Sequence, residues 1–244
     1  MISEVFSSIM GEGKYIGRRY IFIRFRGCPL QCIYCDENIK NNMPSRVEKS
    51  PGSGVFQEYP HIERDLIEIV NHLKTPDLFA VSFTGGEPLL HHKILKEYSE
   101  ELRNLGYKIH LESNGIYPER LFFFDYASID IKLPEHFRSL DEEEYRKIYK
   151  LELRSIKKLY SMGSDVYAKV VVMEDCDPEV VESVAKDISD IGDITLCIQP
   201  VTPINDNIKP IPQRKLLEVM KLCGRYLKDN VMCTPQIHKY LGML

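Results

Sequence analysis

The feature that most constrains the fold of this 244-residue chain is an alternation of short apolar runs with amphipathic stretches from residue 79 onward. The apolar runs predict strands, most of them buried on both faces, at 79–83, 107–111, 122–131, 166–173 and 194–198. Apolar residues recur at helical spacing between them, at 90–105, 145–160 and 180–191. A strand at 20–25 precedes a helix at 62–73, and a late helix covers 216–227. About six strand–helix units fit, and right-handed crossovers would join them into an α/β fold of the incomplete (βα)6-type TIM barrel, a parallel curled sheet with outer helices.

The chain is predicted to form a single domain over residues 1–244, since this length can bury one substantial core. Residues 37–60 break the repeat, because they are rich in Asn, Ser, Pro and Gly and have no apolar period. This segment is predicted to be a loop insertion, and two interpretations stand: a lid over a site, or a solvated and partly disordered loop.

Unusual residues follow several predicted strands. They are Cys28, Gly85-Gly86, Ser113-Asn114-Gly115, Lys132 and Gln199-Pro200. In folds of this kind ligands gather at the carboxyl ends of the strands. The coincidence predicts one shared site at that end of the sheet.

Three closely spaced cysteines, Cys28, Cys32 and Cys35, form a C-x3-C-x2-C run. Three thiolates can hold three irons of a [4Fe–4S] cluster and leave the fourth iron open to a small molecule. Structural zinc usually takes four protein ligands, and His61 is the nearest downstream candidate for the fourth. A disulfide would leave an odd thiol. The spacing favours the open cluster, with zinc as the alternative.

Composition excludes several classes of protein. A net charge of −4 gives no general basic footprint for nucleic acid, and no apolar run approaches a membrane span. The seven cysteines are an odd number, which fits a reducing compartment better than a disulfide framework. The chain is therefore expected to be cytoplasmic, and four further cysteines are expected to be buried free thiols: Cys176, Cys197, Cys223 and Cys233.

The cysteine loop, with Tyr34 before its third cysteine, and the stretch 84–88 (Thr-Gly-Gly-Glu-Pro) after a strand together resemble the radical S-adenosylmethionine (SAM) superfamily. The resemblance implies that the open iron chelates SAM and that an electron from the cluster cleaves its sulfonium. The resulting 5′-deoxyadenosyl radical then removes a hydrogen atom from the substrate. It also implies the SAM contacts Tyr34, Asp36, Gly85, Gly86, Glu87, Asn114, Asp130, Lys132 and Gln199. The two glycines would let backbone carbonyls approach the SAM amino group closely.

The stretch 4–13, Gly17-Arg18, 21–24, Gly27-Cys28 and the terminal 235–239 resemble the 7-carboxy-7-deazaguanine synthase family. Such enzymes rearrange 6-carboxy-5,6,7,8-tetrahydropterin with ring contraction and loss of ammonia, on the route to queuosine and archaeosine in tRNA. The resemblance implies substrate contacts at Ile9, Met10, Gly11, Glu12, Arg24, Thr84, Pro235 and His238. Glu12 would accept from ring N–H groups and Arg24 would clamp the carboxylate, with His238 as proton donor or carboxylate contact; Glu12 and His238 are the catalytic candidates. Further implications are a homodimer and a reductant such as a flavodoxin or ferredoxin.

The chain departs from this family's pattern at three places. Met10 stands where Gln is usual, and Glu37 stands where a Thr or Ser binds Mg²⁺. Glu37 is the candidate Mg²⁺ ligand here, since carboxylates suit hard cations. The run Asp130-Ile131-Lys132 replaces Ser-Pro-Lys and is similar to enzymes that activate glycyl-radical proteins. Such an activase is the alternative function, and a zinc-stabilised or electron-carrying binding module is a third hypothesis.

Overall fold

The computed structural model describes residues 1–35 and 43–243, and within them the strands form one ten-stranded sheet in the order β10-β9-β8-β7-β6-β5-β2-β1-β3-β4. The strands are β1 Ile2–Ile9, β2 Arg19–Phe25, β3 Arg46–Glu48, β4 Phe56–Glu58, β5 Leu78–Gly85, β6 Ile109–Ser113, β7 Tyr126–Ile131, β8 Asp165–Val172, β9 Leu196–Pro200 and β10 Val231–Cys233. Neighbouring strands from β10 through β5 to β2 are parallel. At the other edge β1 is antiparallel to β2, β3 is parallel to β1, and β4 is antiparallel to β3. The predicted parallel sheet is confirmed, with a mixed extension at one edge.

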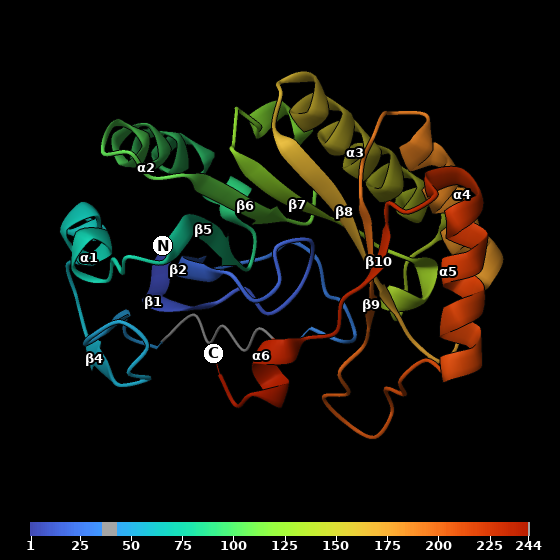
Figure 1. Ribbon diagram of the computed structural model, residues 1–244, viewed down its shortest axis with the longest axis horizontal. Helices are drawn as coiled ribbons and strands as arrows, with labels where there is room; N and C mark the ends of the chain where they lie inside the picture. The colour runs from blue at the N-terminus through green and yellow to red at the C-terminus, as the bar shows by residue number, and fades with distance from the viewer. Residues whose placement is uncertain (36–42, 244) are drawn as a thin grey trace.

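Helices cover the outer side of the curved sheet (Figure 1). They are α1 Leu66–His72, α2 His92–Asn104, α3 Glu142–Ser161, α4 Pro178–Ser189 and α5 Gln213–Leu227, and the chain ends in the short helix α6 Ile237–Tyr240. Local sequence explains two of the starts. Asp141 accepts a hydrogen bond from the backbone N–H of Glu144 at the start of α3, and Asp177 caps α4, whose first residue is proline. The short α6 lies apart from the outer helices, on the inner side of the sheet near the N-terminal strands.

The six predicted strands correspond to β2 and β5 to β9, whereas β1, β3, β4 and β10 were not predicted. In β1 the polar residues Glu4, Ser7 and Ser8 are all buried. Glu4 accepts hydrogen bonds from Arg24 of β2 and Arg46 of β3, and the hydroxyl of Ser7 accepts one from Nε of Arg19 at 2.9 Å. A local pattern of apolar residues cannot reveal such a strand, because its polar groups are satisfied by residues distant in sequence.

The prediction of an irregular loop at 37–60 is wrong for residues 46–58, which form the β3–β4 hairpin. Glu48 secures this hairpin from inside. Its carboxylate accepts from the backbone N–H groups of Gly52 at 3.1 Å and Gly54 at 2.8 Å, and from Ser7 of β1 at 2.9 Å. The hairpin is therefore stabilised by hydrogen bonds to a buried carboxylate, a contribution that the pattern of apolar residues in the sequence does not show. The first part of the predicted insertion, through residue 42, lies outside the described residues.

The main core lies between the sheet and the outer helices, and a smaller aromatic cluster lies on the inner face of the sheet. Phe6 and Phe22 stack in that inner cluster with ring centroids 5.2 Å apart. Three cysteines, Cys176, Cys197 and Cys223, are buried free thiols as predicted, but Cys233 is exposed in the short edge strand β10. Among the described residues, no helix has the length and apolar character needed to cross a membrane.

Candidate active site

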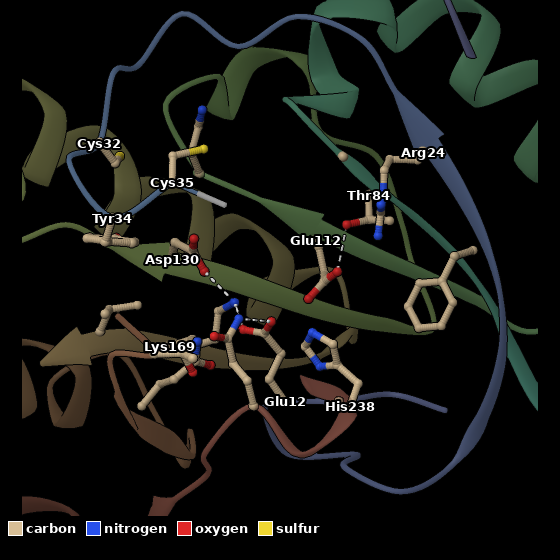
Figure 2. Close-up of a pocket in the computed structure, with 18 of the residues that line it drawn as sticks. Glu12, Arg24, Cys32, Tyr34, Cys35, Thr84, Glu112, Asp130, Lys169 and His238 are labelled. Atoms are coloured by element: carbon tan, nitrogen blue, oxygen red, sulfur yellow. Dashed lines mark hydrogen bonds and ion pairs between the residues drawn. The ribbon is translucent and has the colours of Figure 1, made fainter. Parts of the chain in front are cut away.

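A cavity of about 400 Å³ opens at the carboxyl ends of the parallel strands. Its wall combines the cysteine loop after β2, the strand ends, the segment after β1 and the C-terminal segment after β10. Figure 2 shows the cysteine side chains at one end of this cavity and Arg24 toward the other. The volume lies within the range of small-molecule sites. The shared site predicted from the strand ends is therefore present as one cavity.

Each of the strands β2, β5, β6, β7, β8 and β9 places a polar or charged side chain in the cavity wall. These are Arg24, Thr84, Glu112, Asp130, Lys169 and Gln199. Because side chains alternate along a strand, the residues two positions earlier point to the same face. Phe22 of β2 also lines the cavity, whereas the corresponding residues of the other five strands do not: Ser82, His110, Ser128, Tyr167 and Cys197. The strand period thus separates a polar and charged layer at the cavity from a layer that carries no Asp, Glu, Lys or Arg below it.

The three cysteines of the loop all line the cavity as free thiols. Two backbone hydrogen bonds shape the loop: Cys35 N–H donates to the carbonyl of Cys32, and Ile33 N–H donates to that of His136. Asn114, at the end of β6, lies with Nδ2 at 3.7 Å from Sγ of Cys28. Within residues 1–35 and 43–243, no three His, Cys, Asp or Glu side chains gather as ligands of a single metal ion. Three free thiols around a common cavity suit a larger cluster that each contacts separately.

Gly85 and Gly86 are required by close packing of the end of β5 against the start of the cysteine loop. A Cβ on Gly86 would lie 2.1 Å from the carbonyl oxygen of Gly27. Gly85 has φ +107°, a conformation that disfavours any other residue, and an added Cβ would lie 2.5 Å from the backbone of Phe25. Both glycines also line the cavity. The double glycine therefore fixes where the cysteine loop leaves the sheet.

Glu87 is completely buried and is absent from the lining of the cavity. Its carboxylate accepts hydrogen bonds from the backbone N–H of Leu89 at 2.9 Å, from that of Asn114 at 2.8 Å, and from the hydroxyl of Ser113. Burial raises the pKa of Glu87 to about 7, despite these donors. This residue joins the ends of β5 and β6 and so holds Asn114 beside the cysteine loop.

Tyr34 is held between a cation and a neutral histidine. Its hydroxyl lies 3.1 Å from Nζ of Lys132 and 3.3 Å from Nδ1 of His136. His136 is buried, and burial, followed by the nearby Lys132 charge, lowers its pKa to about 3. Its Nδ1 also accepts from the backbone N–H of Leu133, so Nε2 carries the proton and donates to the carbonyl of Val171 at 2.9 Å. The ring of Tyr34 is thereby fixed at the cavity wall.

Lys169 stands among three carboxylates that come from different parts of the chain. Its Nζ donates to Oε2 of Glu12 at 2.6 Å and lies 3.3 Å from Oδ1 of Asp130. Asp130 also pairs with Lys132 at 2.7 Å, and Glu112 accepts from the hydroxyl of Thr84 at 2.7 Å. Figure 2 shows Glu12, Glu112 and Lys169 facing one another across the cavity.

The charged neighbours and burial shift the pKa values of these three carboxyl groups in different directions. Burial alone would raise the pKa of Asp130, but Lys132 and Lys169 lower it to about 2. Burial would likewise raise the pKa of Glu12, and the Lys169 ammonium outweighs it, so the pKa of Glu12 is lowered. The pKa of Glu112 is raised, because burial and the nearby Glu12 charge outweigh the attraction of Lys169. Of these three carboxyl groups, Glu112 is therefore the one whose protonated form is favoured.

The C-terminal segment closes one side of the cavity by packing on the N-terminal motif. The backbone N–H of Ile237 donates to the carbonyl of Gly11 at 2.9 Å, and Nε2 of Gln236 donates to Oε1 of Glu12 at 3.2 Å. A Cβ on Gly11 would lie only 1.7 Å from Nδ1 of His238. Gly11 therefore permits the contact that brings His238 into the cavity beside Glu12 (Figure 2).

Most of the residues predicted for the site line this cavity. They are Ile9, Met10, Gly11, Glu12, Arg24, Cys28, Cys32, Tyr34, Cys35, Thr84, Gly85, Gly86, Asn114, Asp130, Lys132, Gln199 and His238. Two others lie outside the lining: Glu87 is buried behind it, and Pro235 is exposed next to Gln236. Asp36 and Glu37 lie outside the described residues.

Sequence reasoning missed Glu112, Lys169 and Gln236. Lys169 lies inside the predicted run 166–173 and Glu112 directly follows the predicted run 107–111, yet each is a charged residue within a strand of the sheet. A charge in the middle of a buried strand costs free energy unless it is paired or faces a cavity. That cost is the signal that could have identified them.

Comparison with known proteins extends these observations. The Radical SAM superfamily model matches residues 22–188. The 7-carboxy-7-deazaguanine synthase of Methanocaldococcus jannaschii is 64% identical over 100% of both chains, and that of Methanothermobacter thermautotrophicus is 36% identical over 99% of this chain and 97% of its own. The crystal structure of QueE from Escherichia coli superposes with a TM-score of 0.57 at 18% identity, covering 96% of this chain and 92% of that one, and so supports the fold.

The family match covers more than half of the chain, and the relatives match it from end to end. The chain therefore belongs to the radical SAM superfamily and, within it, to the 7-carboxy-7-deazaguanine synthase family.

Proposed function

We propose that this chain converts 6-carboxy-5,6,7,8-tetrahydropterin to 7-carboxy-7-deazaguanine by a radical ring contraction with loss of ammonia. The observation that carries the proposal is the meeting of Glu12, Arg24 and His238 in the cavity that the three cysteines also line. These residues come from opposite ends of the chain, so a fold without a common ligand would have little reason to gather them. The product is a precursor of queuosine and archaeosine.

In this proposal Cys28, Cys32 and Cys35 would hold a [4Fe–4S] cluster, and the cavity that they line would bind SAM. When bound, these cofactors would supply the radical chemistry of the reaction. The chain itself contributes side chains held in fixed positions around the cavity. Tyr34, fixed by Lys132 and His136, and Asn114, held by Glu87, shape the wall on the cysteine side.

The substrate side of the cavity offers groups that match a carboxypterin. Arg24 supplies a guanidinium for the carboxylate, and Glu12 supplies a carboxylate for N–H groups of the ring. Lys169 keeps Glu12 ionised, because its ammonium favours the charged form. Loss of ammonia requires a proton on the departing nitrogen, and Glu112, whose pKa is raised, is a suitable donor. His238 is the second candidate for moving this proton.

Further parts of the proposal concern the whole enzyme. We expect one catalytic domain over residues 1–244, Mg²⁺ bound through Glu37, a flavodoxin-like or ferredoxin-like reductant, a homodimer and a cytoplasmic location. Carboxylate oxygen is a favoured ligand of Mg²⁺, which supports the role of Glu37. A radical activase of a protein substrate is less well supported, because the C-terminal segment at the cavity favours a small molecule.

The test is an anaerobic assay with reduced, cluster-loaded protein, SAM and the carboxytetrahydropterin. The proposal predicts formation of the deazaguanine acid, faster with Mg²⁺ than with a chelator. Cleavage of SAM without any deazaguanine product would refute the proposed substrate while leaving the cofactors in place. The Cys32→Ala variant is the control, since it should lose both the cluster and turnover.

A further inference from the structure

Three charged side chains lie in register across the mixed edge of the sheet. Glu4 of β1 is paired with Arg24 of β2 on one side and with Arg46 of β3 on the other. Nη1 of Arg24 donates to Oε1 of Glu4 at 2.6 Å. Arg46 binds the second oxygen, Oε2, with two nitrogens: Nε lies 2.6 Å and Nη2 lies 2.5 Å from it. Each oxygen of one carboxylate is therefore bound by a different guanidinium.

Exposure falls from the outside of this row to its centre. The side chain of Arg46 is 41% exposed, that of Arg24 is 24% exposed, and that of Glu4 is only 6% exposed. Arg24 lines the cavity, whereas Glu4 does not. A carboxylate this deeply buried needs partners, and one arginine would neutralise it. With two arginines, the row keeps one net positive charge next to the cavity.

Aromatic rings fix both guanidinium groups from the side. The guanidinium of Arg24 lies 5.0 Å from the centroid of the Phe6 ring, and that of Arg46 lies 4.3 Å from the Phe56 ring. The two rings pack edge to face with centroids 6.3 Å apart. Glu4 thus fixes the direction in which each guanidinium points, and the aromatic ring restricts the orientation of the guanidinium plane. The β3–β4 hairpin supplies Arg46 and Phe56, half of this arrangement.

We propose that Glu4 is a positioning residue that orients Arg24 for the carboxylate of the substrate, braced from the hairpin side by Arg46. A guanidinium recognises a carboxylate through parallel N–H donors, so its orientation decides how well it binds. A flexible arginine would lose freedom on binding, and Glu4 removes that freedom beforehand. The inference rests on the proposed function, in which Arg24 binds this carboxylate.

A simpler role for Glu4 would be charge balance, and the two roles predict opposite signs. If Glu4 only neutralises Arg24, replacing it with glutamine removes a competing anion and tightens binding of an anionic ligand. If Glu4 positions Arg24, the same change weakens binding, because the amide offers one acceptor oxygen to two guanidinium groups. The Glu4→Asp variant keeps the charge but is too short to reach both arginines. Positioning predicts a defect for it, and charge balance predicts none.

The experiment uses the anaerobic, cluster-loaded enzyme with SAM and compares wild type, Glu4→Gln and Glu4→Asp. Two ligands are titrated: 6-carboxypterin, and pterin without the carboxylate. We expect both variants to weaken 6-carboxypterin about 10- to 100-fold and to leave pterin within about twofold. In turnover, KM for the carboxytetrahydropterin should rise while kcat changes little. SAM cleavage without substrate should be unchanged.

Arg46→Met gives a second route if Glu4 variants do not fold, with an expected loss of roughly three- to tenfold for 6-carboxypterin alone. The matched control is Glu182→Gln, which breaks a carboxylate–arginine pair with Arg225 at 3.0 Å between α4 and α5 and should leave both affinities unchanged. Unchanged or tighter binding of 6-carboxypterin in Glu4→Gln would overturn the inference. Absence of turnover in the wild type would instead refute the proposed function, so the two failures are distinguishable.

Discussion

Replacing Gly11 with alanine should disable the substrate side of the site while leaving the cysteine loop intact. The added Cβ would lie 1.7 Å from Nδ1, 2.4 Å from Cγ and 2.8 Å from Cβ of His238. Carbon atoms pack comfortably at about 3.5–4.0 Å, so rotating the imidazole cannot relieve all three contacts. The segment that carries His238 must withdraw by roughly 1 Å or more, and its hydrogen bond from Ile237 to Gly11 must stretch. A displacement of about 1 Å in an active site can cost about 100-fold in rate.

We therefore expect Gly11→Ala to lower kcat/KM about 10- to 100-fold, with normal iron content and normal SAM cleavage in the absence of substrate. The assay is anaerobic formation of the deazaguanine acid, measured for Gly11→Ala, His238→Ala and the double variant. His238→Ala removes the ring contacts at 1.7 and 2.4 Å but keeps the Cβ contact at 2.8 Å. The double variant should therefore be less active than His238→Ala alone, but by less than the product of the two single losses. Wild-type kcat/KM in Gly11→Ala, or losses that multiply in the double variant, would refute this reasoning.

Three further changes test the network around the cavity. Glu87→Gln should cost about 1–3 kcal/mol in denaturant unfolding, because the amide cannot accept from every donor, including the Asn114 N–H. Because the pKa of Glu87 is raised, its contribution to the free energy of unfolding of the wild type should be present below pH 4.5 and should be lost as the pH rises through about 7. If the unfolding free energy of Glu87→Gln depended on pH in the same way, the raised pKa would not belong to Glu87. Lys169→Met should raise the pKa of Glu12 and so move the acidic limb of the kcat/KM profile upward by about 1 pH unit. An acidic limb at the wild-type pH would show that Lys169 does not set the ionisation of Glu12. Glu112→Gln should lower kcat and remove the fall in activity at high pH that a proton donor with a raised pKa produces; a wild-type profile would rule out that role.

The residues that could be predicted from the sequence were those whose role follows from their immediate neighbours in the chain. The spacing of Cys28, Cys32 and Cys35 and the double glycine after a strand carry their meaning within a few positions, and they line one cavity. The parallel strands were predictable because most of their residues are buried and most are apolar. Glu4 and Glu48 illustrate the opposite case. Each is buried, and each has a partner distant in the sequence: Arg24 is 20 positions from Glu4, and Ser7 is 41 positions from Glu48.

The function of a residue was harder to predict than its place. Glu87 belongs to a recognisable motif, yet its carboxylate binds backbone groups behind the cavity. Lys169 belongs to no local motif, but three carboxylates that share its cavity give it a role. Such pairings depend on the register of neighbouring strands, as for Asp130 opposite Lys169, and register is set by the whole sheet.

The central claim is that the three cysteine thiolates hold an iron–sulfur cluster with one iron open to SAM, in the same cavity that binds the pterin. The most direct measurement is iron and acid-labile sulfide analysis of anaerobically prepared protein, combined with electron paramagnetic resonance of the reduced protein with and without SAM. We expect about four irons and four sulfides per chain, together with a signal that changes when SAM is added. About one zinc per chain with no sulfide, or a cluster signal indifferent to SAM, would contradict the account.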